Sequence, residues 1–106
     1  MIAFEVHLNG RKLCTAGVGD HGVLTTNLAW VCRKGEHTRT RKPHSVEEEM
    51  TLDVGGLITP TEEHVRWQER TVRVGDEVRI KVIEVAAVDR PQRRERLTEA
   101  KKKLAS

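Results

Sequence analysis

The chain has 106 residues, of which 37% are hydrophobic and 33% charged, with a formal net charge of +3. This length supports one domain with a single hydrophobic core, and no apolar run approaches the roughly 20 residues that a membrane-spanning helix needs. Residues 1–10 have no basic head and carry Glu5 within their apolar stretch, so they are not typical of a secretory signal. We therefore expect a cytoplasmic protein without a membrane partner.

The first predicted element is a β-hairpin. Apolar side chains occupy every second position over residues 2–8, which is the period of a half-buried strand and places Phe4 in the core. Asn9-Gly10 follows at once, and this dipeptide favours the two positive φ angles of a type I′ turn. We expect residues 11–16 to return as the second strand.

A third strand is predicted over residues 23–34, after a glycine-rich loop. Its apolar residues share one phase that includes Trp30, which predicts that this tryptophan lies in the core. Some of the same residues also fit a helical stripe, so a helix is the alternative. The threonines and valines favour the strand.

Three further strands are expected in the second half of the chain. Residues 33–46 have no apolar period and many charges, which predicts a long exposed loop. We expect Gly55-Gly56 to end the strand that follows the loop, and Trp67 to lie in the core in phase with Val65. The predicted strands cover residues 47–54, 64–69 and 77–85.

The C-terminal segment differs from the rest in charge. Seven of the 19 basic residues lie between Asp89 and Ser106, against three of the 16 acidic residues, so this segment carries +4 and the preceding chain −1. Proline suits the first turn of a helix, so Arg90-Pro91 predicts a helix start. We expect a single β domain over residues 1–89 and a basic, helical tail over residues 90–106.

These patterns together predict an all-β fold. About six short strands separated by turn residues are typical of a small antiparallel sandwich or a partly open barrel, here followed by a charged C-terminal helix or tail.

The residues do not assemble into a recognisable catalytic, metal or cofactor site. Gly17–Gly22 has the spacing G-x-G-x-x-G, but a strand rather than a helix is predicted after it, and Asp20 would meet the pyrophosphate. Cys14 and Cys32 fit no zinc or redox spacing, and none of the five histidines forms an i, i+4 pair. We expect no enzymatic activity and no cofactor.

Two basic clusters are the candidate contact sites for a partner protein or a nucleic acid, since lysine and arginine bind phosphates and acidic surfaces. The candidate residues are Arg33, Lys34, Arg39, Arg41, Lys42, Arg93, Arg94, Arg96, Lys101, Lys102 and Lys103. The three aromatic residues Phe4, Trp30 and Trp67 all fall in core phase, which leaves no exposed platform for stacking bases. This pattern favours a protein partner over nucleic acid.

Two resemblances accompany these patterns. The segment VRVGDEVRIKVIEV, preceded by Gly56-Leu57-Ile58, resembles a strand of the RNA-binding OB domain found in a ribosomal protein and its relatives. The segment FEVHLNGRKLCTAGVGDHGVL, together with VGGL, HVRW and VGDEVRIKV, looks like small bacterial proteins described as hypothetical. The second resemblance implies a bacterial, compact β fold and no particular activity.

The leading functional hypothesis is a non-enzymatic protein-interaction module. Its partner would bind by strand addition at an open sheet edge, or by electrostatic docking on the basic loop or tail. The alternative is a nucleic-acid-binding β domain that uses the loop from Arg33 to Lys42 and the basic tail. A small enzyme with an unrecognised site is the third hypothesis. No pattern in the sequence specifies an oligomeric state.

Overall fold

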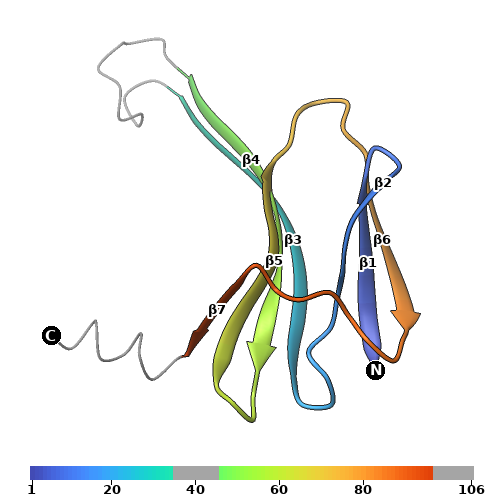
Figure 1. The fold of residues 1–106 in the computed structure, drawn as a ribbon. Helices are drawn as coiled ribbons and strands as arrows, with labels where there is room; N and C mark the ends of the chain where they lie inside the picture. Colours follow the sequence, from blue (N-terminus) through green and yellow to red (C-terminus); the bar gives the residue numbers. More distant parts are fainter. Residues whose placement is uncertain (35–45, 97–106) are drawn as a thin grey trace, which may run out of the picture.

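The computed structural model describes residues 1–34 and 46–96, which form seven β-strands and no helix (Figure 1). The strands are β1 (Ile2–Leu8), β2 (Arg11–Ala16), β3 (Gly22–Lys34), β4 (Val46–Ile58), β5 (Glu63–Thr71), β6 (Val78–Glu84) and β7 (Arg93–Arg96). The prediction of an all-β chain is confirmed. Every predicted strand is present, and β7 is an additional short one.

The strands form two antiparallel sheets that face each other and do not close into a barrel (Figure 1). One sheet has the order β2-β1-β6 and the other the order β3-β4-β5-β7. The two sheets approach each other most closely where β2 meets β5. The edges of β3 and β6 therefore lie on the side away from this contact.

The predicted β1–β2 hairpin is confirmed. Asn9 and Gly10 both have positive φ angles, 53° and 79°, as a type I′ turn requires. Residues outside the hairpin also bind the turn. The Asn9 side chain donates to Asp76 Oδ1 at 3.0 Å and accepts from the Glu77 N–H at 2.9 Å. The first hairpin is thereby fixed to the turn between β5 and β6.

The next two strands are longer than the pattern predicted. β3 is a strand, and the helical alternative is excluded by its continuous antiparallel register with β4. The expectation that Gly55-Gly56 ends a strand is wrong, because β4 continues through both glycines to Ile58. A Cβ on Gly55 would lie 2.7 Å from the Val65 carbonyl oxygen, so the glycine admits a close approach of the neighbouring strand.

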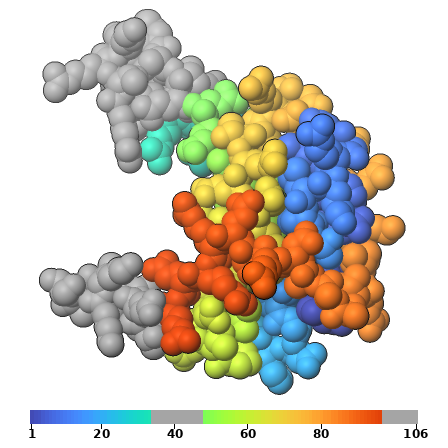
Figure 2. Space-filling view, in the orientation of Figure 1, coloured from blue at the N-terminus to red at the C-terminus, as the bar shows by residue number. Residues whose placement is uncertain are grey.

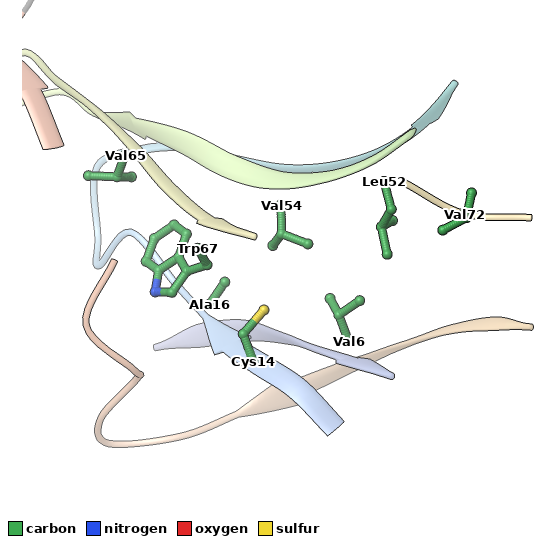
Figure 3. Close-up of a cluster of buried hydrophobic side chains, with 8 residues drawn as sticks. All are labelled: Val6, Cys14, Ala16, Leu52, Val54, Val65, Trp67 and Val72. Atoms are coloured by element: carbon green, nitrogen blue, oxygen red, sulfur yellow. The ribbon is translucent and has the colours of Figure 1, made fainter. Parts of the chain in front are cut away.

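The core lies between the two sheets (Figure 3). Its buried residues are Val6, Cys14 and Ala16 from the first sheet, Leu52, Val54, Val65 and Trp67 from the second, and Val72 after β5. Trp67 is 2% exposed, which confirms its predicted burial.

The β4–β5 register shifts between Val54 and Gly55, so β5 has one extra residue at this point. As a result, Trp67 and the adjacent Gln68 both lie toward the smaller sheet. Gln68 Nε2 donates to the carbonyl of Leu13 on β2 at 3.3 Å.

The predicted burial of Trp30 is wrong, and that of Phe4 holds in part. Phe4 is half-buried and packs against the core. Trp30 is 63% exposed, although it pairs with Met50, which does pack against the core. The side chain thus points to the inner face of its sheet, as predicted. It is exposed because the smaller sheet does not extend over this part of the edge strand β3.

The chain after β6 closes one side of the molecule. The Met1 amino group and amide carbonyl both bond Val85, and Thr15 and Asp89 exchange two hydrogen bonds through the Asp89 side chain and N–H. Trp67 Nε1 then donates to the Asp89 carbonyl at 2.7 Å. In the space-filling view this segment, orange to red, runs from the smaller sheet onto the larger one (Figure 2).

The helix predicted from Arg90-Pro91 is not formed over the described part of that segment. Gln92 donates its N–H to the Arg66 carbonyl at 2.8 Å, and Arg93–Arg96 pair with β5 as strand β7. The physical reason is the free edge of β5, whose unpaired backbone groups are satisfied by an extended chain and not by a helix. The rest of the predicted helix, residues 97–106, lies outside the described residues.

Candidate functional site: the open side between β3 and β6

The candidate site is the side of the molecule opposite the closing segment, formed by the edges of β3 and β6 and called here the open side. Leu28 pairs with the fully buried Leu52, and Ile80 with the fully buried Val6. Directly paired residues in a sheet point to the same face. Leu28 and Ile80 therefore point to the inner side of their sheets, yet they are 56% and 47% exposed.

Two neighbours on the same strands repeat this arrangement. Trp30 on β3 and Val82 on β6 are 63% and 66% exposed. Their partners Met50 and Phe4 pack against the core, so these side chains also point inward. The open side thus exposes apolar side chains in positions that a covering layer buries elsewhere in the molecule. Soluble proteins rarely leave such inward positions uncovered unless a partner binds there.

The four sheet edges differ in chemistry. The β2 edge bonds Asp89 through Thr15, and β7 consists only of charged residues. The β6 strand, VRIKVIE, carries charges that alternate with its apolar residues. By contrast, β3 has neither a charged residue nor a proline between Gly22 and Cys32. Charges and prolines are what protects edge strands from pairing with other chains, so β3 is the unprotected edge.

The upper part of β3 belongs to a two-stranded arm. β4 pairs with β5 only from Thr51 onward, so residues 30–34 of β3 and 46–50 of β4 have only each other as strand partners. Figure 1 shows this arm extending beyond the two sheets. Trp30 Nε1 donates to Glu48 Oε1 across it at 2.9 Å. A two-stranded ribbon by itself is marginal in water, which makes the arm a segment that gains from a further strand.

The structure does not bring the predicted basic residues into one surface. Arg33 and Lys34 end β3 at the tip of the arm, whereas Arg93, Arg94 and Arg96 form β7 at the opposite edge of the same sheet. Arg94 is directed to Glu63, with Nε 3.7 Å from Oε2. The other candidates, which lie outside the described residues, are Arg39, Arg41, Lys42, Lys101, Lys102 and Lys103.

A shallow groove of about 990 Å³ lies on the outer face of the four-stranded sheet, and it was not predicted from the sequence. Two of the charged residues that line it, Asp53 and Arg66, form an ion pair. Arg66 Nε lies 3.8 Å from Asp53 Oδ1, and Arg66 Nη1 lies 2.8 Å from Glu69 Oε2. The polar residues that alternate with Val65 and Trp67 could have indicated a polar outer face, but not its curvature.

Neither metal nor thiol chemistry is evident in the described residues. Within residues 1–34 and 46–96, no three histidine, cysteine, aspartate or glutamate side chains gather as a metal site would require. Both cysteines are free. Burial, and secondarily the charge of Asp89, raises the pKa of the Cys14 thiol from 9.0 to about 11, so this thiol is neutral near pH 7.

Comparisons with known proteins add no assignment. We compared the chain with models of protein families, with curated proteins and with solved structures, and none of the three comparisons found a match. Within the described residues, no helix has the length and hydropathy that crossing a bilayer requires. The open side itself is therefore the feature of the molecule that indicates a function.

Proposed function

We propose that this protein is a non-enzymatic interaction module that binds another polypeptide by strand addition at the β3 edge. The observation that carries the proposal is the combination of features on β3. The strand is an unpaired edge without charged residues from Gly22 to Cys32, and it exposes Leu28 and Trp30 on the inner face of its sheet. A cytoplasmic location and a bacterial origin remain part of the proposal.

The energetics support a strand as the bound element. A bound strand would satisfy the free N–H and C=O groups of β3, each hydrogen bond contributing roughly 0.5–1.5 kcal/mol net. Its side chains would cover the exposed apolar positions, where fully burying one large apolar side chain contributes roughly 1.5–3 kcal/mol. Hydrogen bonds between the two main chains would provide affinity. Because Leu28 and Trp30 are two residues apart on one face of β3, they would contact every second side chain of the partner strand and so provide specificity.

A site-specific photo-cross-linker tests the proposal. Benzoylphenylalanine is introduced at Leu28 in cells that make the protein, and at Val74 as a matched control, since Val74 is 91% exposed in the turn between β5 and β6. We expect polypeptide adducts from position 28 that resist nuclease, and none above background from position 74. Equal adduct yields at both positions, or adducts that nuclease removes, would contradict strand addition to a protein partner.

A further inference from the structure

We propose that the strand bound at the β3 edge is β3 of a second copy of this chain, so that two copies form a symmetric dimer through antiparallel β3–β3 pairing. This inference rests on the proposed function, because it names the partner of the same edge. It would join two four-stranded sheets into one continuous sheet across a two-fold axis.

The composition of β3 is self-complementary in this arrangement. The strand spans 13 residues, Gly22–Lys34, and its midpoint is Leu28. A two-fold axis at Leu28 uses the whole strand and places Leu28 opposite Leu28 of the partner subunit. Trp30 then lies opposite the partner subunit's Thr26, and Leu24 opposite the partner subunit's Cys32. All of these side chains lie on the inner face, so the exposed Leu28 side chains cover each other and each exposed Trp30 packs beside the partner subunit's Thr26.

The charges of β3 favour the antiparallel pairing of two copies. Arg33 and Lys34 are the only charged residues of the strand, and both are at its end. Antiparallel pairing places Arg33 opposite the partner subunit's Val23 and Lys34 opposite the partner subunit's Gly22. Like charges are therefore kept at opposite ends of the seam. The strands β6 and β7 carry charges along their length, so pairing with either would bring arginines and lysines against the uncharged middle of β3 as well as its ends.

The two-stranded arm also favours a second copy of the chain as the partner of the β3 edge. With the axis at Leu28, residues 30–34 of each arm pair with residues 22–26 of the partner subunit. In this chain residues 22–26 pair with residues 54–58 of β4, which β5 flanks in turn. Each marginal two-stranded arm would thus be laid against a complete sheet. A two-fold interface uses the same edge on both copies and closes at two, so it would not extend into fibres.

The C-terminal segment of the same chain is a poor candidate for this edge. The described chain ends at Arg96 on β7, which lies across β4 and β5 from β3 in the same sheet. Any segment that continues from Arg96 would have to cross a face of the sheet to reach the open side. The β3 edge of a second copy meets no such obstacle.

Sedimentation velocity on the purified full-length protein tests the dimer. We expect wild type to be a dimer at micromolar concentration and Leu28→Lys to be a monomer, because the axis would bring two lysines directly opposite each other. The dissociation constant should rise on the order of a hundredfold or more, since like charges opposed in an interface are strongly unfavourable. Val74→Lys is the control that adds the same charge at a position 91% exposed on the turn between β5 and β6, outside the β3 edge, and it should remain dimeric.

A cysteine scan gives a readout that does not depend on destabilisation. In a Cys14→Ser, Cys32→Ser background, Leu28→Cys should form an intermolecular disulfide on mild oxidation, because a residue on the axis meets its own copy within the reach of a disulfide. Thr25→Cys, which would pair with the partner subunit's Val31, should not. Circular dichroism of each variant confirms that the strands are retained.

The outcomes separate this inference from the proposed function. A wild-type protein that is monomeric at all concentrations, or a Leu28→Lys variant that stays dimeric, would overturn the β3–β3 dimer. If the monomeric protein still forms polypeptide adducts from position 28 in cells, the strand-addition function stands with a different partner. If position 28 forms no adducts either, both proposals fail.

Discussion

The two tryptophans show how one residue type takes two roles in this chain. Trp67 is 2% exposed and donates its indole N–H to the Asp89 carbonyl, whereas Trp30 is 63% exposed and donates to Glu48 on the arm. Both side chains point to the inner face of the same sheet. The difference is that the smaller sheet covers Trp67 on β5 and does not extend over Leu28 and Trp30 on β3.

This difference predicts unequal costs of truncation. Trp67→Ala should lower the free energy of unfolding by roughly 3–5 kcal/mol, the usual loss for a large core aromatic. Trp30→Ala should cost less than about 1 kcal/mol in the isolated subunit, as surface substitutions do. Urea unfolding measures both, in the Leu28→Lys background so that association does not contribute. Equal losses for the two variants would show that Trp30 belongs to the core.

The two cysteines should differ in reactivity for a related reason. Because burial raises the pKa of Cys14 to about 11, its reactive thiolate is scarce at pH 8 and becomes abundant only as the pH approaches 11. In a Cys32→Ser variant we expect slow alkylation by iodoacetamide at pH 8, with a rate that rises close to tenfold per pH unit. A rate that levels off near pH 9 would contradict a raised pKa for Cys14.

At the scale of elements, the segment after β6 explains why one side of the molecule is closed. It bonds β1 through Val85, β2 through Asp89 and β5 through Gln92 before it becomes β7. Pro91 has no N–H, so it costs no hydrogen bond at the crossing between the sheets. The residues predicted as the start of a basic tail thus continue the larger sheet as far as Arg96.

Two truncations test this role. Ending the chain after Arg96 keeps every hydrogen bond described here, and its melting temperature should stay close to that of the full chain. Ending it after Asp89 removes β7 and the Gln92–Arg66 bond, so it should lower the free energy of unfolding by about 2 kcal/mol or more at roughly 0.5–1.5 kcal/mol per backbone bond. Thermal melts followed by circular dichroism compare the two. Equal melting temperatures would show that β7 is dispensable.

At the scale of the whole molecule, the shape is flat and extended. The radius of gyration is 17.0 Å and the extents are 52 × 44 × 16 Å, whereas a compact domain of this length has a radius of gyration of about 13 Å. The arm and the uncovered edges account for the excess. The basic residues of β3 and β7 lie at opposite edges of this flat molecule, which argues against one joint surface for nucleic acid.

The separation of the basic clusters predicts how oligonucleotides bind. We expect weak binding that is lost between about 50 and 200 mM salt, as for any short cationic segment. Charge reversal of Arg33 and Lys34 and charge reversal of Arg93, Arg94 and Arg96 should have additive effects on the binding free energy, because distant sites act independently. Fluorescence anisotropy across a salt series measures this. Tight binding near physiological salt, or strongly non-additive losses, would instead support the nucleic-acid hypothesis.

Local patterns by themselves determined most of the strands. The alternation over residues 2–8 and the Asn9-Gly10 turn act within a few residues, so the first hairpin could be predicted from them and is present with the expected φ angles. The phase of Trp30 and Trp67 was also predicted correctly, because the period of two decides which face of a sheet a side chain joins. The sequence contains no recognisable motif of a catalytic, metal or cofactor site, so no pattern indicated a functional site at the open side.

Only the tertiary structure decided which faces are covered and which edges are free. The period of a strand contains no information on whether a second sheet lies opposite, so Trp30 and Trp67 were indistinguishable in sequence and differ in exposure. The strand β7 has no apolar alternation, since all of its residues are charged, and it is extended because the edge of β5 offers it backbone partners. Burial and strand addition depend on what other segments bring into contact, and that is a property of the packed chain and not of any local run of residues.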